Sequence, residues 1–297
     1  MIFSGVFAAL TTPFAQDGSV SLPDLKHNVL LYNQTDLAGY VAVGSTGESV
    51  LLSRAEMDGI LATVKEAANG KKILAGTGAE STAETIERTK RAAELGYDAA
   101  LVKTPFYYKN AYKSDVLLTH YRRVADESPI PVMLYSIPQF TGIALTATDV
   151  AALSEHPNII GMKDSSGNVQ GVAETIAATP PKFQVLVGSA ASVYPSLAIG
   201  ARGAILALAC ALPEKCVALY ELFQQGHHEK ARELQAILVR ASKLLVSELS
   251  IAGVKYAMDQ RGYRGGIPRP PLLPLHHEQK KRLTDLLATL EPAAVRA

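Results

Sequence analysis

The sequence predicts an α/β fold, a (β/α)8 TIM barrel followed by a C-terminal helical extension. Eight short runs rich in Val, Ile and Ala recur along the first part of the 297-residue chain. Amphipathic stretches separate them, giving strand-helix repeats of roughly 25–35 residues, as such a barrel requires. The runs are apolar almost throughout instead of alternating, which is typical of parallel strands buried on both faces.

The eight predicted strands follow one another along the chain. They cover residues 5–10, 39–43, 72–76, 99–102, 131–135, 159–162, 184–187 and 203–208. Helix starts lie between them, because Ser53 with Glu56 and Ser81 with Glu84 fit the capping box. In that motif the serine hydroxyl accepts the backbone N–H of the glutamate, and the glutamate carboxylate accepts the backbone N–H of the serine.

The pattern changes after the eighth strand. Leu and Ala recur at helical spacing over residues 213–240, a second helical stretch covers 241–259, and a third follows the Pro-rich segment 267–274. No flexible Gly/Ser linker precedes these stretches. The sequence therefore predicts a barrel core of residues 1–211 and a helical extension of residues 212–297, packed on the barrel as one structural unit.

Composition and charge exclude several classes of function. Lys and Arg number 29 against 28 Asp and Glu, with no basic block, so a nucleic-acid partner is not expected. The chain has no apolar run of about 18 residues and no signal-peptide pattern at its start, which predicts a cytoplasmic protein without a membrane span. Cys210 and Cys216, placed in one predicted helical stretch, are expected to be buried free thiols.

Candidate functional residues are sought at the C-terminal ends of the strands, where the active site of such a barrel lies. None of the seven histidines falls at these positions, so no metal site is expected. The polar segments at the strand ends are Gly44-Ser45-Thr46-Gly47-Glu48, residues 103–108, Tyr135-Ser136-Ile137-Pro138, Lys163-Asp164-Ser165 and Gly188-Ser189-Ala190.

Two lysines stand at ends of apolar strands, Lys163 and Lys103. Burying a lysine in its charged form is costly, so such a position favours the neutral amine that attacks a carbonyl group. Two residues before Lys163 is Gly161, which leaves room on the same barrel face, whereas Lys103 has Leu101 there. This favours Lys163 weakly, and the alternative is a rim lysine paired with Asp164.

Two further groups suit the same chemistry. Ser45 and Thr46 lie in a tight turn whose backbone N–H groups and hydroxyls can hold a carboxylate, although the segment can also be an ordinary turn. Tyr135 carries a phenol that can shuttle protons if a neighbouring hydroxyl bonds to it. Its alternative role is packing, as for many buried tyrosines.

Taken together, these motifs resemble the family of pyruvate-dependent Schiff-base aldolases that includes dihydrodipicolinate synthase and N-acetylneuraminate lyase. The resemblance covers nearly the whole chain. It implies a lyase acting on a small 2-oxo acid, usually a homotetramer, with no cofactor other than the covalent lysine–pyruvate imine. It identifies Lys163 as the Schiff-base lysine, Tyr135 as the proton relay, and Ser45 with Thr46 as the pyruvate carboxylate loop, Ser45 also belonging to the relay.

The resemblance assigns roles to further residues. Tyr107 matches a relay tyrosine that family tetramers often supply across a subunit interface. Ile205 matches the residue whose backbone carbonyl faces bound pyruvate, and Lys103 has no counterpart. Ser165 matches a serine near the distal carboxylate in 4-hydroxy-2-oxoglutarate aldolase, and Gly188 belongs to the strand-7 motif expected to contact substrate.

The second substrate depends on departures from the family pattern. Synthases acting on aspartate semialdehyde have an arginine where this chain has Phe140, and a bidentate arginine pairs strongly with a carboxylate. Sialate lyases have Asn at the position of Ser136 and acidic residues in place of the small run 188–191.

The motifs of strands 5, 6 and 7 most resemble 4-hydroxy-2-oxoglutarate aldolase, although Thr46 stands where the animal aldolase has Asn. We therefore expect an aldolase that cleaves a short 4-hydroxy-2-oxo acid, such as 4-hydroxy-2-oxoglutarate, with dihydrodipicolinate synthase as the alternative. A sialate or sugar-acid lyase and a non-catalytic relative that binds 2-oxo acids are less favoured.

Overall fold

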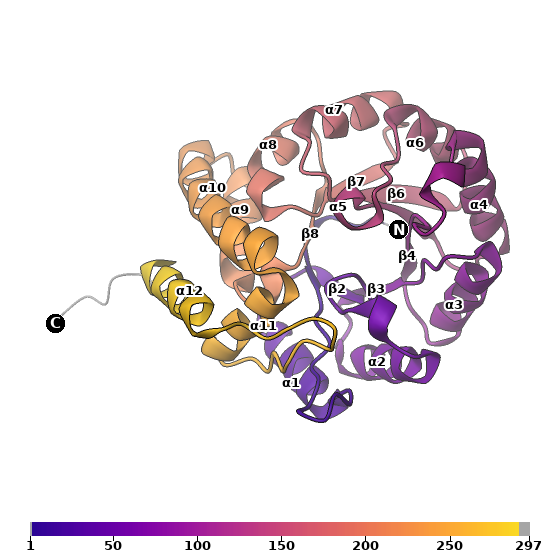
Figure 1. The fold of residues 1–297 in the computed structure, drawn as a ribbon. Helices are drawn as coiled ribbons and strands as arrows, with labels where there is room; N and C mark the ends of the chain where they lie inside the picture. Colours follow the sequence, from indigo (N-terminus) through magenta and orange to yellow (C-terminus); the bar gives the residue numbers. More distant parts are fainter. Residues whose placement is uncertain (1, 291–297) are drawn as a thin grey trace.

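The computed structural model describes residues 2–290, and its eight strands form one closed barrel (Figure 1). Each strand pairs in parallel with the next along the chain, and β8 pairs back with β1. The predicted TIM barrel is confirmed, with strand ends within two residues of those predicted. The strands are β1 (Gly5–Ala9), β2 (Gly39–Ala42), β3 (Lys72–Gly76), β4 (Ala99–Lys103), β5 (Val132–Ser136), β6 (Ile159–Asp164), β7 (Gln184–Val187) and β8 (Gly203–Leu206).

Helices surround the barrel. At the start of α2, Ser53 Oγ accepts the Glu56 N–H while the Glu56 carboxylate accepts the Ser53 N–H, so the predicted capping box is complete. At α3, Ser81 Oγ accepts the Glu84 N–H at 3.1 Å, but the Glu84 carboxylate binds Arg88 instead of closing the box. The surrounding helices are α1 (Leu22–Tyr32), α2 (Arg54–Ala67), α3 (Thr82–Glu94), α4 (Ser114–Glu127), α5 (Pro138–Thr141), α6 (Ala147–Ser154), α7 (Val169–Ala178) and α8 (Val193–Ala198).

The C-terminal extension packs beside α8 (Figure 1), and its first helix also contacts β1. The predicted stretch 213–240 is two helices, because Gly226 adopts a positive φ of 76° and ends the first. The stretch 241–259 is also divided, into a π-helix and an α-helix. The elements are α9 (Pro213–Gln224), α10 (His228–Ser242), the π-helix η5 (Lys243–Glu248), α11 (Ser250–Gln260) and α12 (His277–Leu290).

The predicted boundary between residues 211 and 212 falls between the 3₁₀ helix η4 (Leu208–Cys210) and α9. Residues 291–297 of the predicted extension lie outside the described residues. Whether the barrel and the extension fold as one unit stays a prediction. No helix within residues 2–290 is long and apolar enough to cross a membrane.

The barrel interior is a packed core that closes one end of the site. Phe3 and Phe7 fill the N-terminal end, with ring centroids 6.0 Å apart, and Leu74, Leu101 and Met133 lie in the same cluster. Inward side chains of such a barrel stack in layers and leave no channel. The lysine and tyrosine side chains of the candidate site, Lys163 and Tyr135, lie at the opposite, C-terminal end of the strands.

Both cysteines are buried free thiols, as predicted. Burial raises the pKa of Cys210 to about 12 and raises that of Cys216 as well, which keeps both thiols protonated at neutral pH. The expectation that they share a helical stretch was wrong. Cys210 ends η4 on the barrel and Cys216 lies on α9, because the chain turns at Leu212 and Pro213.

Candidate active site

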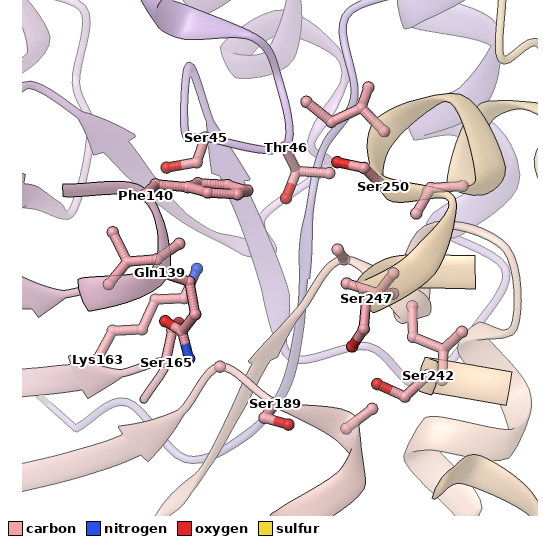
Figure 2. Close-up of a pocket in the computed structure, with 18 of the residues that line it drawn as sticks. Ser45, Thr46, Gln139, Phe140, Lys163, Ser165, Ser189, Ser242, Ser247 and Ser250 are labelled. Carbon is pink, nitrogen blue, oxygen red and sulfur yellow. The ribbon is translucent and has the colours of Figure 1, made fainter. Parts of the chain in front are cut away.

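A cavity of about 280 Å³ lies at the C-terminal end of the barrel, between the strands and the extension (Figure 2). Its walls come from the loop after β2, from the ends of β5 to β8, and from η5 and α11. Six predicted site residues line it together: Ser45, Thr46, Tyr135, Lys163, Ser165 and Gly188. This convergence follows from the topology, because the C-terminal ends of all eight strands meet at one end of a parallel barrel.

Lys163 projects into this cavity from β6 and is 5% exposed. Its Nζ lies 4.3 Å from the centroid of the Tyr135 ring, and the two residues are register partners on neighbouring strands. Asp164, considered as a partner for a rim lysine, instead accepts hydrogen bonds from the N–H and the hydroxyl of Ser166 at 2.8 and 2.5 Å. Lys163 is the one charged side chain among the described residues that line the cavity.

Lys103 also ends a strand but points away from the cavity. Its Nζ donates to the carbonyl of Gly78 at 2.8 Å and lies 5.1 Å from the centroid of the Phe106 ring. Burial lowers the pKa of Lys103 to about 8, partly opposed by the charge of Glu80. The structure thus separates two lysines that look equivalent in the sequence.

Gly161 does not have the role that the sequence predicts for it. A Cβ at Gly161 would lie 2.3 Å from the carbonyl oxygen of Gln184 on β7. The glycine therefore permits the close approach of two strand backbones and does not make room beside Lys163.

In Figure 2, Ser45 and Thr46 of the β2 loop lie at the upper edge of the cavity, across from Lys163 and Ser165. The Tyr135 hydroxyl donates to Ser45 Oγ at 3.5 Å, a long bond of the kind that tightens when substrate binds. The loop is held by turns, with the Glu48 N–H donating to the Ser45 carbonyl at 3.1 Å. Among the described residues, nothing accepts a hydrogen bond from the backbone N–H of Ser45 or Thr46, so both donors can serve an anion.

Gly188 keeps open the space that Ser165 and Lys163 share. A Cβ at Gly188 would lie 1.8 Å from Ser165 Oγ and 3.0 Å from Lys163 Cε. Its N–H also donates to the Asp164 carbonyl at 2.6 Å, which fixes the β7 end against β6. Any larger residue at position 188 must displace a side chain of the site.

We expect Gly188→Ala to lower kcat/KM at least about tenfold, because displacing reacting groups by about 1 Å can cost up to 10²-fold. The control is Gly59→Ala on α2, where the added Cβ meets only Leu22 methyl groups at 3.4 Å or more. Steady-state kinetics of both variants check this. Unchanged kcat/KM in Gly188→Ala would contradict the tight placement of Ser165 and Lys163.

Two predicted site residues do not line the cavity. Tyr107 is 73% exposed and its ring packs edge-on against Tyr108, while the Glu80 carboxylate accepts its N–H at 2.8 Å. Its action across a subunit interface stays a prediction, because one chain is described. Ile205 is fully buried on β8 inside the barrel, and its carbonyl contact with pyruvate also stays a prediction.

Sequence reasoning missed the wall that the extension supplies. Ser242, Ser247 and Ser250 line the cavity across from Lys163 (Figure 2). Ser247 lies within the π-helix η5, Ser242 ends α10 just before it, and Ser250 begins α11 just after it. Ser250 has a positive φ of 53°, which is unusual for a residue other than glycine. None of the three serines lies at the end of a strand, so the strand-end motifs could not indicate them.

Comparison with known proteins supports this geometry. The model of the dihydrodipicolinate synthetase family matches residues 2–290. A 4-hydroxy-tetrahydrodipicolinate synthase of Exiguobacterium sp. is 38% identical, over 95% of this chain and 96% of that protein. A probable mitochondrial 4-hydroxy-2-oxoglutarate aldolase of Emericella nidulans is 36% identical, over 95% of this chain and 93% of that protein.

Solved structures agree over the full length. Dihydrodipicolinate synthase DapA-2 from Bacillus anthracis superposes with a TM-score of 0.94 at 29% identity, covering 98% of this chain and 100% of the other. A monomeric dihydrodipicolinate synthase variant superposes with a TM-score of 0.91 at 26% identity, covering 96% of each chain. Members of this family act through a covalent lysine–pyruvate imine without an external cofactor. The chain belongs to the dihydrodipicolinate synthetase family and is a lyase.

Proposed function

We propose that this chain joins pyruvate to a second carbonyl compound, or releases pyruvate from the corresponding aldol, through an imine at Lys163. The observation that carries the proposal is the single cavity in which the Lys163 amine, the Tyr135 phenol and the Ser45–Thr46 loop converge. Lys163 is buried in this cavity, no carboxylate is found among the described lining residues, and a lysine amine is the group that forms an imine with a carbonyl compound.

Each group has a chemical role. The Lys163 amine forms a bond to the keto carbon of pyruvate, and the keto oxygen leaves as water. The resulting iminium withdraws electrons and makes the methyl carbon acidic. Tyr135 passes its hydroxyl proton to Ser45, 3.5 Å away, takes the methyl proton in its place, and gives a proton back in the reverse step. We expect Tyr107 of a second subunit to carry the relay onward from Ser45.

Pyruvate is proposed to lie with its carboxylate on the β2 loop. The N–H groups of Ser45 and Thr46 and their hydroxyls supply the donors, and the carbonyl of Ile205 faces the opposite side of the molecule. This fixes the methyl carbon relative to Tyr135 before the second substrate enters.

For the second substrate, the comparisons favour the synthase reaction over the aldolase reaction that the strand motifs favour. Of the two relatives reported above, the one of higher identity carries a synthase name, and so do both solved structures. We therefore propose condensation of pyruvate with aspartate semialdehyde as the first candidate reaction. The aldolase reaction is the second candidate for two reasons. Phe140 lines the cavity at the position where the resemblance expects an arginine, and the Ser165 hydroxyl, also in the lining, can donate a hydrogen bond to the distal carboxylate of a small substrate.

The test is steady-state turnover of pyruvate plus aspartate semialdehyde against cleavage of 4-hydroxy-2-oxoglutarate, at equal enzyme concentration. We expect the first kcat/KM to exceed the second at least about tenfold, a difference of roughly 1.4 kcal/mol in transition-state binding. A higher kcat/KM for cleavage of 4-hydroxy-2-oxoglutarate would instead identify the protein as the aldolase. The control is Lys163→Ala, which must remove both activities.

We also propose a cytoplasmic homotetramer. The support is Tyr107, whose ring is exposed in the single chain although the resemblance places it in the proton relay. A second subunit at this surface would bring its own Tyr107 to the cavity. The monomeric variant among the solved structures shows that assembly varies among similar chains.

A further inference from the structure

A buried ion pair connects the β2 loop to the C-terminal extension. Lys255 Nζ on α11 lies 2.6 Å from Glu48 Oε1, and the two side chains are 1% and 0% exposed. The other Glu48 oxygen accepts the backbone N–H of Arg269 at 2.8 Å. Lys255 also donates to the Ile267 carbonyl at 2.7 Å, so the extension holds both ends of the pair.

Glu48 controls the conformation of the residues just before it. Its backbone has a positive φ of 57°, which costs free energy for any residue with a side chain and persists only where surrounding contacts enforce it. Its N–H closes a turn onto the Ser45 carbonyl, and the neighbouring Gly47 carbonyl accepts the Thr12 hydroxyl at 2.7 Å. The Glu48 backbone is thus part of the turn that carries the Ser45 and Thr46 N–H groups.

Lys255 lies on α11, the helix that supplies the opposite wall of the cavity. Its neighbour Val254 lines the cavity, as do Ser250 and Ile251 one turn earlier on α11. Lys255 itself does not line the cavity. The pair with Glu48 thus sets the separation between the carboxylate loop and the α11 wall.

A second cation strengthens the same junction. The Phe14 ring contacts both cations, with Lys255 Nζ at 4.5 Å and the Arg269 guanidinium carbon at 4.2 Å from its centroid. Arg269 also makes two hydrogen bonds to the Glu56 carboxylate at 2.6 and 3.0 Å, and donates to the Leu51 carbonyl. Such bidentate pairs fix geometry as well as charge.

We infer that Lys255 is a positioning residue for pyruvate, acting through Glu48 to hold the Ser45–Thr46 loop in its carboxylate-binding conformation. The inference rests on the proposed function. A buried ion pair is weak evidence for stability, and its better-supported use is to select one arrangement among several. Here the arrangement selected is the one that aims two backbone donors at the cavity.

The test compares Lys255→Met, which removes the charge and keeps the length, with Lys255→Arg, which keeps the charge. The readouts are KM and kcat for pyruvate, and the pyruvate concentration at which borohydride trapping on Lys163 is half-maximal. We expect Lys255→Met to raise KM and the half-maximal concentration about 10- to 100-fold, while trapping at saturating pyruvate is retained. Lys255→Arg should restore most of the loss.

Two controls separate positioning from stability. Tyr97→Phe removes a buried hydrogen bond to the Leu61 carbonyl. Neither residue belongs to the ion pair or lines the cavity, so this variant should lower the melting temperature without changing KM. If Lys255→Met does not fold, the double variant Glu48→Gln with Lys255→Met leaves no buried unpaired charge and is measured instead. A folded variant with KM within twofold of the parent chain would overturn the inference. Failure of the parent chain to trap pyruvate would instead refute the proposed function.

Discussion

Replacing Lys163 with alanine is expected to lower kcat at least about 10⁴-fold, because removal of a covalent nucleophile leaves only binding and electrostatic contributions. The imine cannot form without the amine, and no other lining side chain carries one. Borohydride reduction in the presence of pyruvate should add a pyruvate-derived mass to the peptide that contains Lys163. The alanine variant should take up no such mass.

Lys103→Ala is the matched control for this prediction. Lys103 ends β4 as Lys163 ends β6, and both flank Tyr135 in the strand register. Because the pKa of Lys103 is lowered to about 8, much of this amine is neutral in a mildly alkaline assay, so it is a genuine competitor. The hydrogen bond to Gly78 holds the Lys103 amine out of the cavity, so borohydride trapping of pyruvate should persist in the Lys103→Ala variant. A pyruvate adduct on Lys103 would contradict the assignment of Lys163.

The barrel could be predicted from the sequence because its signal is local. Each strand is a short apolar run, and parallel pairing of neighbouring strands brings all their C-terminal ends to the same end of the barrel. That rule alone placed Lys163, Tyr135 and Ser165 around one cavity. It could not distinguish Lys163 from Lys103, because the direction of the Lys103 side chain depends on a hydrogen bond to Gly78, in the loop after a different strand.

The remainder of the site depends on contacts between distant segments. Ser247 and Ser250 come from the extension, whose sequence shows helical spacing but does not show which face meets the barrel. The junction of Glu48 with Lys255 joins the second βα loop to α11, and neither residue alone indicates a partner. Tyr107 differs again, because its proposed role needs a second chain.

Tyr135→Phe is expected to lower kcat about 10²–10⁴-fold, the range that general acid–base catalysis contributes. The phenyl ring remains, so packing inside the barrel and the contact of Lys163 Nζ with the ring face are preserved. Only the hydroxyl that donates to Ser45 is lost. The melting temperature should therefore change little while proton transfer fails.

Exchange of the pyruvate methyl protons with solvent deuterium, followed by NMR, measures that step directly. The variant should still form the imine at saturating pyruvate, but exchange should slow by the same factor as kcat. Tyr121→Phe is the matched control, because its buried hydroxyl donates to the Val102 carbonyl at 3.2 Å outside the cavity. If Tyr135→Phe exchanged protons at the parental rate, another group would have to carry the proton. Ser45 would then be the next residue to replace, since its hydroxyl is the partner of the Tyr135 phenol at the cavity edge.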